Sequence, residues 1–149
     1  MTDTTKQFDI IVYGATSFVG QIMLEYLADY QGEPITWAIA GRNEQKLLDA
    51  KQDNNLSHIP HIIAHANDEA ALTAMCAQTK VVISTVGPYA LFGETLVKVC
   101  AETGTDYCDL TGEPQWIKAM LDKSEETAKT SGSSLINSAG FDSIPSELG

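Results

Sequence analysis

The chain has 149 residues, of which 44% are hydrophobic and 19% are charged. This balance is typical of one globular domain with a substantial core, and it excludes a disordered chain. Twenty acidic and nine basic residues give a formal net charge of −11, so we expect no nucleic acid partner. We find no signal-peptide pattern and no apolar run long enough to span a membrane, and we therefore expect a cytoplasmic protein.

Short apolar stretches alternate with amphipathic stretches along the chain. The apolar stretches predict β-strands at residues 8–13, 35–40, 61–64, 81–85, 106–110 and 135–137. The segments between them predict helices at about 18–30, 68–77 and 92–103, and further helices after Asn43 and Pro114. We expect Asn67 to cap the helix at 68–77. The apolar face expected for the helix at 18–30 includes Val19, Ile22, Tyr26 and Leu27.

This alternation of strands and helices predicts an α/β fold, in which helices cover both faces of a parallel sheet. Right-handed connections between the strands favour a doubly wound (Rossmann) sheet of six strands in the order 3-2-1-4-5-6. Such sheets bind ligands outside the carboxyl ends of their strands. The loops that follow the strands are therefore the places where site residues are expected.

The segment YGATSFVG (13–20) has the features of a phosphate-binding turn. It leaves a strand and opens a helix, where Gly14 permits a tight turn and Gly20 a close helix–sheet contact. The helix start directs unpaired N–H groups and a partial positive charge toward a pyrophosphate. Ser17 replaces the middle glycine of a GxxGxxG spacing, and its hydroxyl is able to add a phosphate hydrogen bond. The alternative is a tight turn that binds nothing. The cofactor-binding residues predicted here are Gly14, Thr16, Ser17, Phe18 and Val19.

Arg42 follows the second strand, where the adenine ribose of a bound dinucleotide would lie. NAD-binding folds usually carry an acidic residue there, whereas the planar fork of an arginine suits a 2′-phosphate. Lys46, one helical turn further on, adds a second positive charge. We therefore predict that the cofactor is NADP and that NADPH is preferred over NADH. The alternative is that Arg42 pairs with a surface carboxylate.

Thr85, Gly87, Pro88 and Tyr89 follow the fourth strand, at the point where the strand order reverses. Gly87 and Pro88 bring the backbone close to whatever lies there, which we expect to be the ribose and nicotinamide side of the cofactor. Tyr89 is a candidate to reach the reacting centre. The alternative is a rigid loop in which Tyr89 is simply packed.

Other groups of reactive side chains point less clearly to a site. Cys76, Cys100 and Cys108 form no CxxC pair, and we interpret them as buried reduced thiols. On a strand, His61 and His65 would lie on one face but roughly 13 Å apart, too far to share one zinc ion, so no metal site is predicted.

Three carboxylates are expected at the carboxyl edge of the sheet, namely Asp109, Glu113 and Asp142. One of them is able to handle a proton beside a hydride transfer. Solvated caps and helix starts explain them equally well, so the catalytic residues stay unassigned.

Several motifs occur in an order that resembles a known family. They are VYGAT (12–16), WAIAGRN (37–43), TVGPY (85–89), GE (93–94), GTDYCDLTGE (104–113) and GFDSIPS (140–146). Together they resemble the saccharopine-dehydrogenase-like oxidoreductases, a group that includes trans-acting enoyl reductases of lipid biosynthesis. The resemblance implies that residues 1–149 form an NAD(P)-binding amino-terminal domain, and that a carboxy-terminal domain absent from this chain supplies much of the substrate site. Ser17 is a departure, because most members have glycine at this position.

Two functions from different classes fit these observations. The first is an oxidoreductase that transfers hydride between NADPH and an enoyl- or imine-type small molecule, which the resemblance suggests to be lipid-related. The second is a non-catalytic dinucleotide sensor that acts through a protein partner. Because a substrate domain would cover part of the surface, we expect the domain alone to expose apolar side chains that favour self-association.

Overall fold

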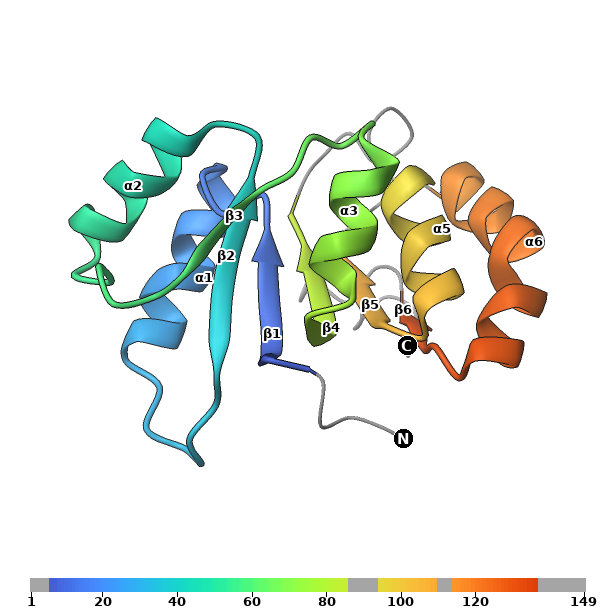
Figure 1. Ribbon diagram of the computed structural model, residues 1–149, viewed down its shortest axis with the longest axis horizontal. Helices are drawn as coiled ribbons and strands as arrows, with labels where there is room; N and C mark the ends of the chain where they lie inside the picture. Colours follow the sequence, from blue (N-terminus) through green and yellow to red (C-terminus); the bar gives the residue numbers. More distant parts are fainter. Residues whose placement is uncertain (1–5, 86–93, 110–113, 137–149) are drawn as a thin grey trace.

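The computed structural model describes residues 6–85, 94–109 and 114–136. These residues form a six-stranded sheet in the order β3-β2-β1-β4-β5-β6, and each neighbouring pair of strands is parallel (Figure 1). The strands are β1 (Phe8–Tyr13), β2 (Trp37–Gly41), β3 (His61–Ile63), β4 (Thr79–Ser84), β5 (Asp106–Asp109) and β6 (Leu135–Ile136). The predicted fold class and strand order are confirmed.

Helices cover both faces of the sheet. On one side lie α1 (Phe18–Ala28) and α2 (Glu44–Asp53), and on the other lie α3 (Glu69–Cys76), α5 (Glu94–Thr103) and α6 (Pro114–Ser131) (Figure 1). The central strand β1 serves both layers, because its side chains alternate between them. Ile11 and Tyr13 pack with α3 and α5, whereas Val12 packs with α1 and α2.

Two of the three cysteines lie in the layer formed by α3 and α5. Cys76 and Cys100 are fully buried free thiols whose sulfur atoms are 3.6 Å apart. The neighbouring Cys76 thiol and burial together raise the pKa of Cys100, which disfavours the reactive thiolate. Cys108 is half-buried. The prediction of reduced thiols with a packing role is confirmed for Cys76 and Cys100.

Side chains at the expected helix starts act as caps. The Asn43 side chain accepts a hydrogen bond from the Lys46 amide at 3.0 Å and caps α2 as predicted. The predicted cap of α3 is wrong by one residue, because Asp68 rather than Asn67 accepts a hydrogen bond from the amide of Ala71. Asparagine and aspartate are equally good caps, so the sequence does not separate neighbouring candidates.

Several ends of elements also differ from the predicted positions. Strand β4 begins at Thr79 rather than at residue 81, and most of the other ends shift by a single residue. Helix α1 ends at Ala28 rather than at residue 30, and Gly32 and Pro34 in the following loop oppose its continuation. Strand β2 begins at Trp37 rather than at residue 35, because its register with β1 starts there.

The predicted apolar face of α1 is largely wrong. Val19, Ile22 and Tyr26 are 39%, 51% and 64% exposed, whereas the side of the helix facing the sheet carries Gly20, Leu24 and Leu27. Only Leu27 belongs to both sets. We call the exposed set the α1 stripe, which consists of Phe18, Val19, Ile22, Tyr26 and Tyr30.

The close approach of Gly20 to the preceding turn explains this rotation of α1. A Cβ atom on Gly20 would lie 2.3 Å from the carbonyl oxygen of Gly14 and 2.8 Å from backbone atoms of Ala15. No other residue type fits without moving the backbone, so the glycine side of the helix must face the turn. The large apolar side chains of the α1 stripe are consequently turned outward.

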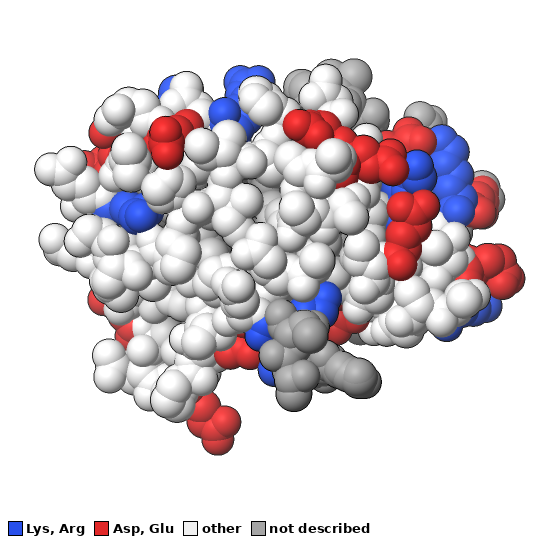
Figure 2. Space-filling view, viewed as in Figure 1, with Lys and Arg blue, Asp and Glu red and all other residues white. Residues whose placement is uncertain are grey.

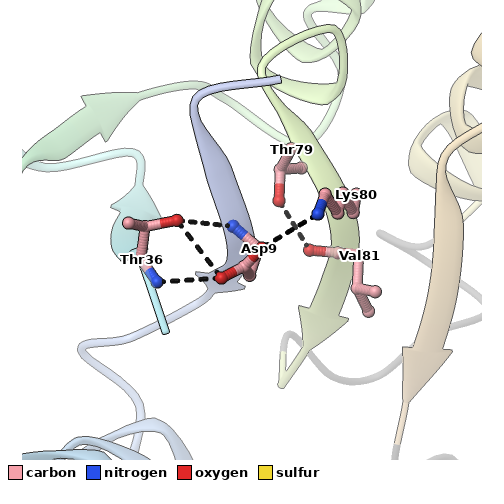
Figure 3. A network of polar contacts seen from close by, with 5 residues as sticks. All are labelled: Asp9, Thr36, Thr79, Lys80 and Val81. Carbon is pink, nitrogen blue, oxygen red and sulfur yellow. Dashed lines mark hydrogen bonds and ion pairs between the residues drawn. The ribbon is translucent and has the colours of Figure 1, made fainter. Parts of the chain in front are cut away.

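A polar network joins three strands near the amino edge of the sheet. Asp9 on β1 accepts a hydrogen bond from the Thr36 amide at 3.0 Å, just before β2, and forms a 3.3 Å ion pair with Lys80 on β4 (Figure 3). The Thr36 amide and the Lys80 ammonium group lower the pKa of Asp9. The ion pair with Lys80 therefore exists only while Asp9 is ionised, and the ionised carboxylate is also the stronger acceptor for the Thr36 amide.

We expect Asp9→Asn to destabilise the fold at neutral pH but not in acid. The folded-state pKa of Asp9 is lowered, so its contribution is complete above the usual carboxylate pKa and is lost as the pH falls through the lowered value. Because the pair is exposed, the loss should not exceed about 1 kcal/mol. Urea unfolding between about pH 7 and pH 3 measures it. Glu33→Gln, which changes an exposed side chain in a loop, without a partner among the described residues, is the control. A loss that is independent of pH would contradict the prediction.

Candidate functional site

The candidate site lies at the carboxyl edge of the sheet, where β1 and β4 are neighbours. The chain leaves β1 toward α1 and β2, whereas the strands that follow β4 lie on its other side. A doubly wound sheet has its ligand crevice at such a switch point. The turn at residues 14–17 follows β1, and Thr85 follows β4.

The turn after β1 is held in one conformation by backbone contacts. Gly14 has a φ angle of 85°, which favours glycine. Its amide and that of Ala15 donate to the carbonyl of Ala40 at 2.9 and 3.3 Å. The Ser17 amide donates back to the carbonyl of Gly14 at 3.0 Å. The predicted tight turn is therefore confirmed at Gly14.

Three amide groups of this segment remain available for a ligand. The N–H groups of Thr16, Phe18 and Val19 have no hydrogen-bond partner among the described residues. Those of Phe18 and Val19 belong to the first turn of α1, where the helix dipole adds a partial positive charge. Such an arrangement suits an anion that accepts several hydrogen bonds, and a pyrophosphate is one.

A pair of hydroxyl groups connects the turn to the end of β4. The Ser17 Oγ caps α1 by accepting a hydrogen bond from the Gly20 amide at 3.0 Å, and it lies 3.1 Å from the Thr85 Oγ1. Thr85 is buried, and its hydroxyl lies 2.8 Å from the carbonyl oxygen of Gly14 and 3.1 Å from that of Tyr13. The sequence placed Ser17 and Thr85 at one sheet edge but gave no sign that they touch.

The basic residues near the end of β2 differ from the others that the structure describes. Arg42 and Lys46 are exposed, and neither side chain forms an ion pair or hydrogen bond with a described residue. The predicted alternative, a carboxylate partner for Arg42, is thus not seen within the described ranges. Burial raises the pKa of Tyr13 to about 12, and the positive charge of nearby Arg42 acts in the opposite direction.

Most other cations already have partners. Lys98 pairs with Glu69 and Lys123 with Glu94, linking α3, α5 and α6. Figure 2 shows this pattern on one face, where blue and red side chains lie together over α5 and α6. Among the described residues, the charges of Arg42 and Lys46 are therefore uncommitted, and such charges suit a phosphate group.

The remaining predicted residues are only partly testable. Gly87, Pro88 and Tyr89 lie outside the described residues, as do Glu113 and Asp142. Asp109 ends β5 and is fully buried, and its Oδ2 accepts a hydrogen bond from the Tyr107 hydroxyl at 2.5 Å. A solvated cap is therefore the wrong interpretation of Asp109. Residues 107 and 109 are two positions apart on one strand and therefore point to the same face, and this spacing was the sequence signal for the contact.

Among the described residues, no group of three histidine, cysteine or acidic side chains could hold a metal ion. His61 instead lies between Lys51 and Glu44, at 3.1 and 3.2 Å. In the same part of the chain, no helix is both long and apolar enough to cross a membrane.

Comparison with known proteins agrees with this geometry. The family model described as the saccharopine dehydrogenase NADP binding domain matches residues 10–136. A putative trans-acting enoyl reductase of Mycobacterium tuberculosis is 42% identical over 150 residues, which cover 99% of this chain and 36% of the relative. The lipid droplet localized protein of Caenorhabditis elegans is 40% identical over 151 residues, covering 97% of this chain and 35% of the relative.

Among solved structures, saccharopine dehydrogenase (L-Glu forming) of Saccharomyces cerevisiae has the same fold, with a TM-score of 0.74 at 24% identity. The likeness covers 91% of this chain and 28% of that protein. The free amides after β1 and the free cations after β2 fit a phosphorylated dinucleotide, and the family match confirms NADP as the predicted cofactor. The chain spans 36% of the length of the first curated relative, and it belongs to the saccharopine dehydrogenase NADP-binding domain family.

Proposed function

We propose that this chain is the cofactor-binding part of an oxidoreductase that transfers hydride to or from an enoyl- or imine-type substrate. The observation that carries the proposal is that backbone amides and basic side chains without partners among the described residues lie at the same edge of the sheet. Three amides after β1 and two cations after β2 have no partner among the described residues. Together they match the two phosphate-bearing parts of NADP.

The roles of individual residues follow from this match. The amides of Thr16, Phe18 and Val19 would bind the pyrophosphate, which is the group that needs several donors. Arg42 would form a forked contact with the 2′-phosphate, and Lys46 would add charge at the start of α2. When bound, NADPH supplies the hydride.

The nicotinamide half would extend from the turn past Thr85, which ends the neighbouring strand β4. Gly87, Pro88 and Tyr89 follow Thr85 in the sequence, and we propose that they approach this half of the cofactor. The switch point between β1 and β4 supports this direction, because ligands of doubly wound sheets cross the sheet edge there.

The substrate proposal rests on relatives. The Mycobacterium tuberculosis relative is named an enoyl reductase, and the Caenorhabditis elegans relative is named for lipid droplets. We propose a lipid-related enoyl substrate, a site completed by a carboxy-terminal domain outside these 149 residues, and a cytoplasmic location. Cell fractionation would separate the cytoplasmic location from a lipid droplet.

We also propose that the α1 stripe mediates self-association of this chain. Its side chains from Phe18 to Tyr26 lie along one side of α1, Tyr30 follows just after the end of the helix, and Phe18 is 82% exposed. A contiguous apolar strip of this kind is unusual on a free surface and is covered when two chains meet.

Turnover tests the function directly. We expect this chain to bind NADPH but not to oxidise it with enoyl thioesters, because hydride transfer requires a substrate held about 3–3.5 Å from the nicotinamide in a dry site. A polypeptide that includes the proposed carboxy-terminal domain should oxidise NADPH with at least one such thioester. Rapid turnover by the 149-residue chain would contradict the division of roles, and inactivity of the longer polypeptide toward enoyl and imine substrates would contradict the reaction.

The 2′-phosphate contact predicts the cofactor preference. The wild-type chain should bind NADPH more tightly than NADH, and Arg42→Ala should reduce the ratio of the two dissociation constants by about ten- to a hundredfold. Titration calorimetry measures both constants. Lys80→Ala is the matched control, because Lys80 is paired with Asp9 at the opposite edge. Equal affinities of the wild type for NADPH and NADH would contradict the assignment of Arg42.

Self-association is tested by sedimentation velocity over a range of concentrations. We expect the wild-type chain to gain mass as its concentration rises, and the double variant Ile22→Lys, Tyr26→Lys to stay monomeric with an unchanged circular dichroism spectrum. The control Leu48→Lys replaces an apolar residue of α2 that is 40% exposed but lies outside the α1 stripe. A wild-type chain that is monomeric at every concentration would contradict the proposal.

A further inference from the structure

Ser17 lies at the centre of the phosphate turn, and its hydroxyl already has two partners. It accepts a hydrogen bond from the Gly20 amide at 3.0 Å and lies 3.1 Å from the Thr85 hydroxyl oxygen. Each hydroxyl group owns a single hydrogen atom. The direction of the Ser17–Thr85 bond therefore decides whether Ser17 has a hydrogen left for a ligand.

The surroundings of Thr85 fix that direction. Its Oγ1 lies 2.8 Å from the carbonyl oxygen of Gly14 and 3.1 Å from that of Tyr13. The 2.8 Å distance to the Gly14 carbonyl is that of an O–H···O hydrogen bond, and a carbonyl oxygen has no hydrogen to give. The Thr85 hydrogen consequently points to these carbonyls, and Ser17 is the donor in its bond with Thr85.

A phosphate oxygen only accepts hydrogen bonds, so Ser17 has no hydrogen left for one while it donates to Thr85. We propose that Ser17 is a positioning residue, whose hydroxyl fastens the phosphate turn to the end of β4 rather than contacting the pyrophosphate. This inference rests on the proposed NADP site. It assigns phosphate binding to the backbone and a separate task to the Ser17 side chain.

The Ser17–Thr85 hydrogen bond matters for cofactor binding because the proposed phosphate-binding amides lie next to Ser17 in the chain. The free amides of Thr16 and Phe18 are its immediate neighbours, and the Val19 amide follows. Without the hydroxyl, the Gly20 amide loses its acceptor and the turn loses its side-chain link to β4. The three amides then need to be ordered when the cofactor binds, which lowers affinity without removing any direct contact.

A double-mutant cycle separates positioning from direct binding. The variants are Ser17→Ala, Thr85→Val and their combination, and the readout is the dissociation constant for NADPH. Thr85→Val leaves neither carbonyl orphaned, because the Thr85 amide still donates to Tyr13 and the Ser17 amide to Gly14. We expect each single variant to weaken binding about three- to tenfold, and the double variant to bind no more weakly than Ser17→Ala alone.

Three further measurements distinguish this result from general damage. Ser17→Thr keeps a hydroxyl and should restore NADPH binding. The dissociation constant for 2′-AMP, which has the 2′-phosphate but no pyrophosphate, should be the same for wild type and Ser17→Ala. Thr105→Val should leave NADPH affinity unchanged although it lowers stability. Thr105 is a buried threonine at the amino edge whose hydroxyl lies 2.9 Å from that of Thr103 and donates to the carbonyl of Cys76.

The outcomes also separate this inference from the proposed function. Additive losses in the double variant would show that Ser17 contacts the phosphate itself, and would overturn the positioning role while the NADP site stands. Unchanged NADPH affinity in Ser17→Ala would overturn it as well. A wild-type chain that does not bind NADPH would overturn both the proposed function and the inference.

Discussion

The contact between Gly20 and the Gly14 carbonyl is the constraint on which the other features of the site depend. A Cβ atom on Gly20 would lie only 2.3 Å from that oxygen, so the backbone of α1 at Gly20 packs directly against the preceding turn. This approach fixes the rotation of α1, which directs Leu24 and Leu27 into the core and the α1 stripe outward. It also places the first free amides of the helix beside the turn. The absence of a side chain at Gly20 thus determines which residues of α1 pack in the core, which are exposed and how the amino-terminal end of the helix is placed against the turn.

Electrostatics explains how so acidic a chain can hold an anionic cofactor. The formal net charge of −11 repels phosphate at a distance, but binding is decided by local fields. Away from the candidate site, basic side chains form ion pairs between helices, such as Lys98–Glu69 and Lys123–Glu94. Arg42 and Lys46, near the end of β2, have no partner among the described residues, and the α1 dipole adds partial positive charge near the end of β1. Positive charge is therefore present at the sheet edge where a dinucleotide needs it.

The fold was predictable because buried parallel strands give continuous apolar runs, and because right-handed connections leave few possible orders. The roles of the glycines at positions 14 and 20 in the turn also followed from residue type and place, whereas the sequence left open whether Arg42 pairs with a carboxylate. The face of α1 did not, since two sets of apolar residues recur at helical spacing and only a three-dimensional clash at Gly20 selects between them. Likewise, the sequence could not show that Ser17 meets Thr85, which lies 68 positions away along the chain.

The Ser17–Thr85 contact joins the two parts of the site that the topology brings together. The turn after β1 carries the amides that we propose bind the pyrophosphate, whereas Thr85 precedes in sequence the residues that we propose approach the nicotinamide. Parallel pairing of Tyr13 with Ser84 aligns the ends of these strands, but the alignment of strands does not fix the loops that follow. The Ser17–Thr85 hydroxyl pair, which is tied to the Gly14 carbonyl on one side and to the Gly20 amide on the other, fixes the turn relative to the end of β4. A glycine at position 17 has no side chain with which to make either bond. The serine therefore provides rigidity at the point where a glycine would provide only space.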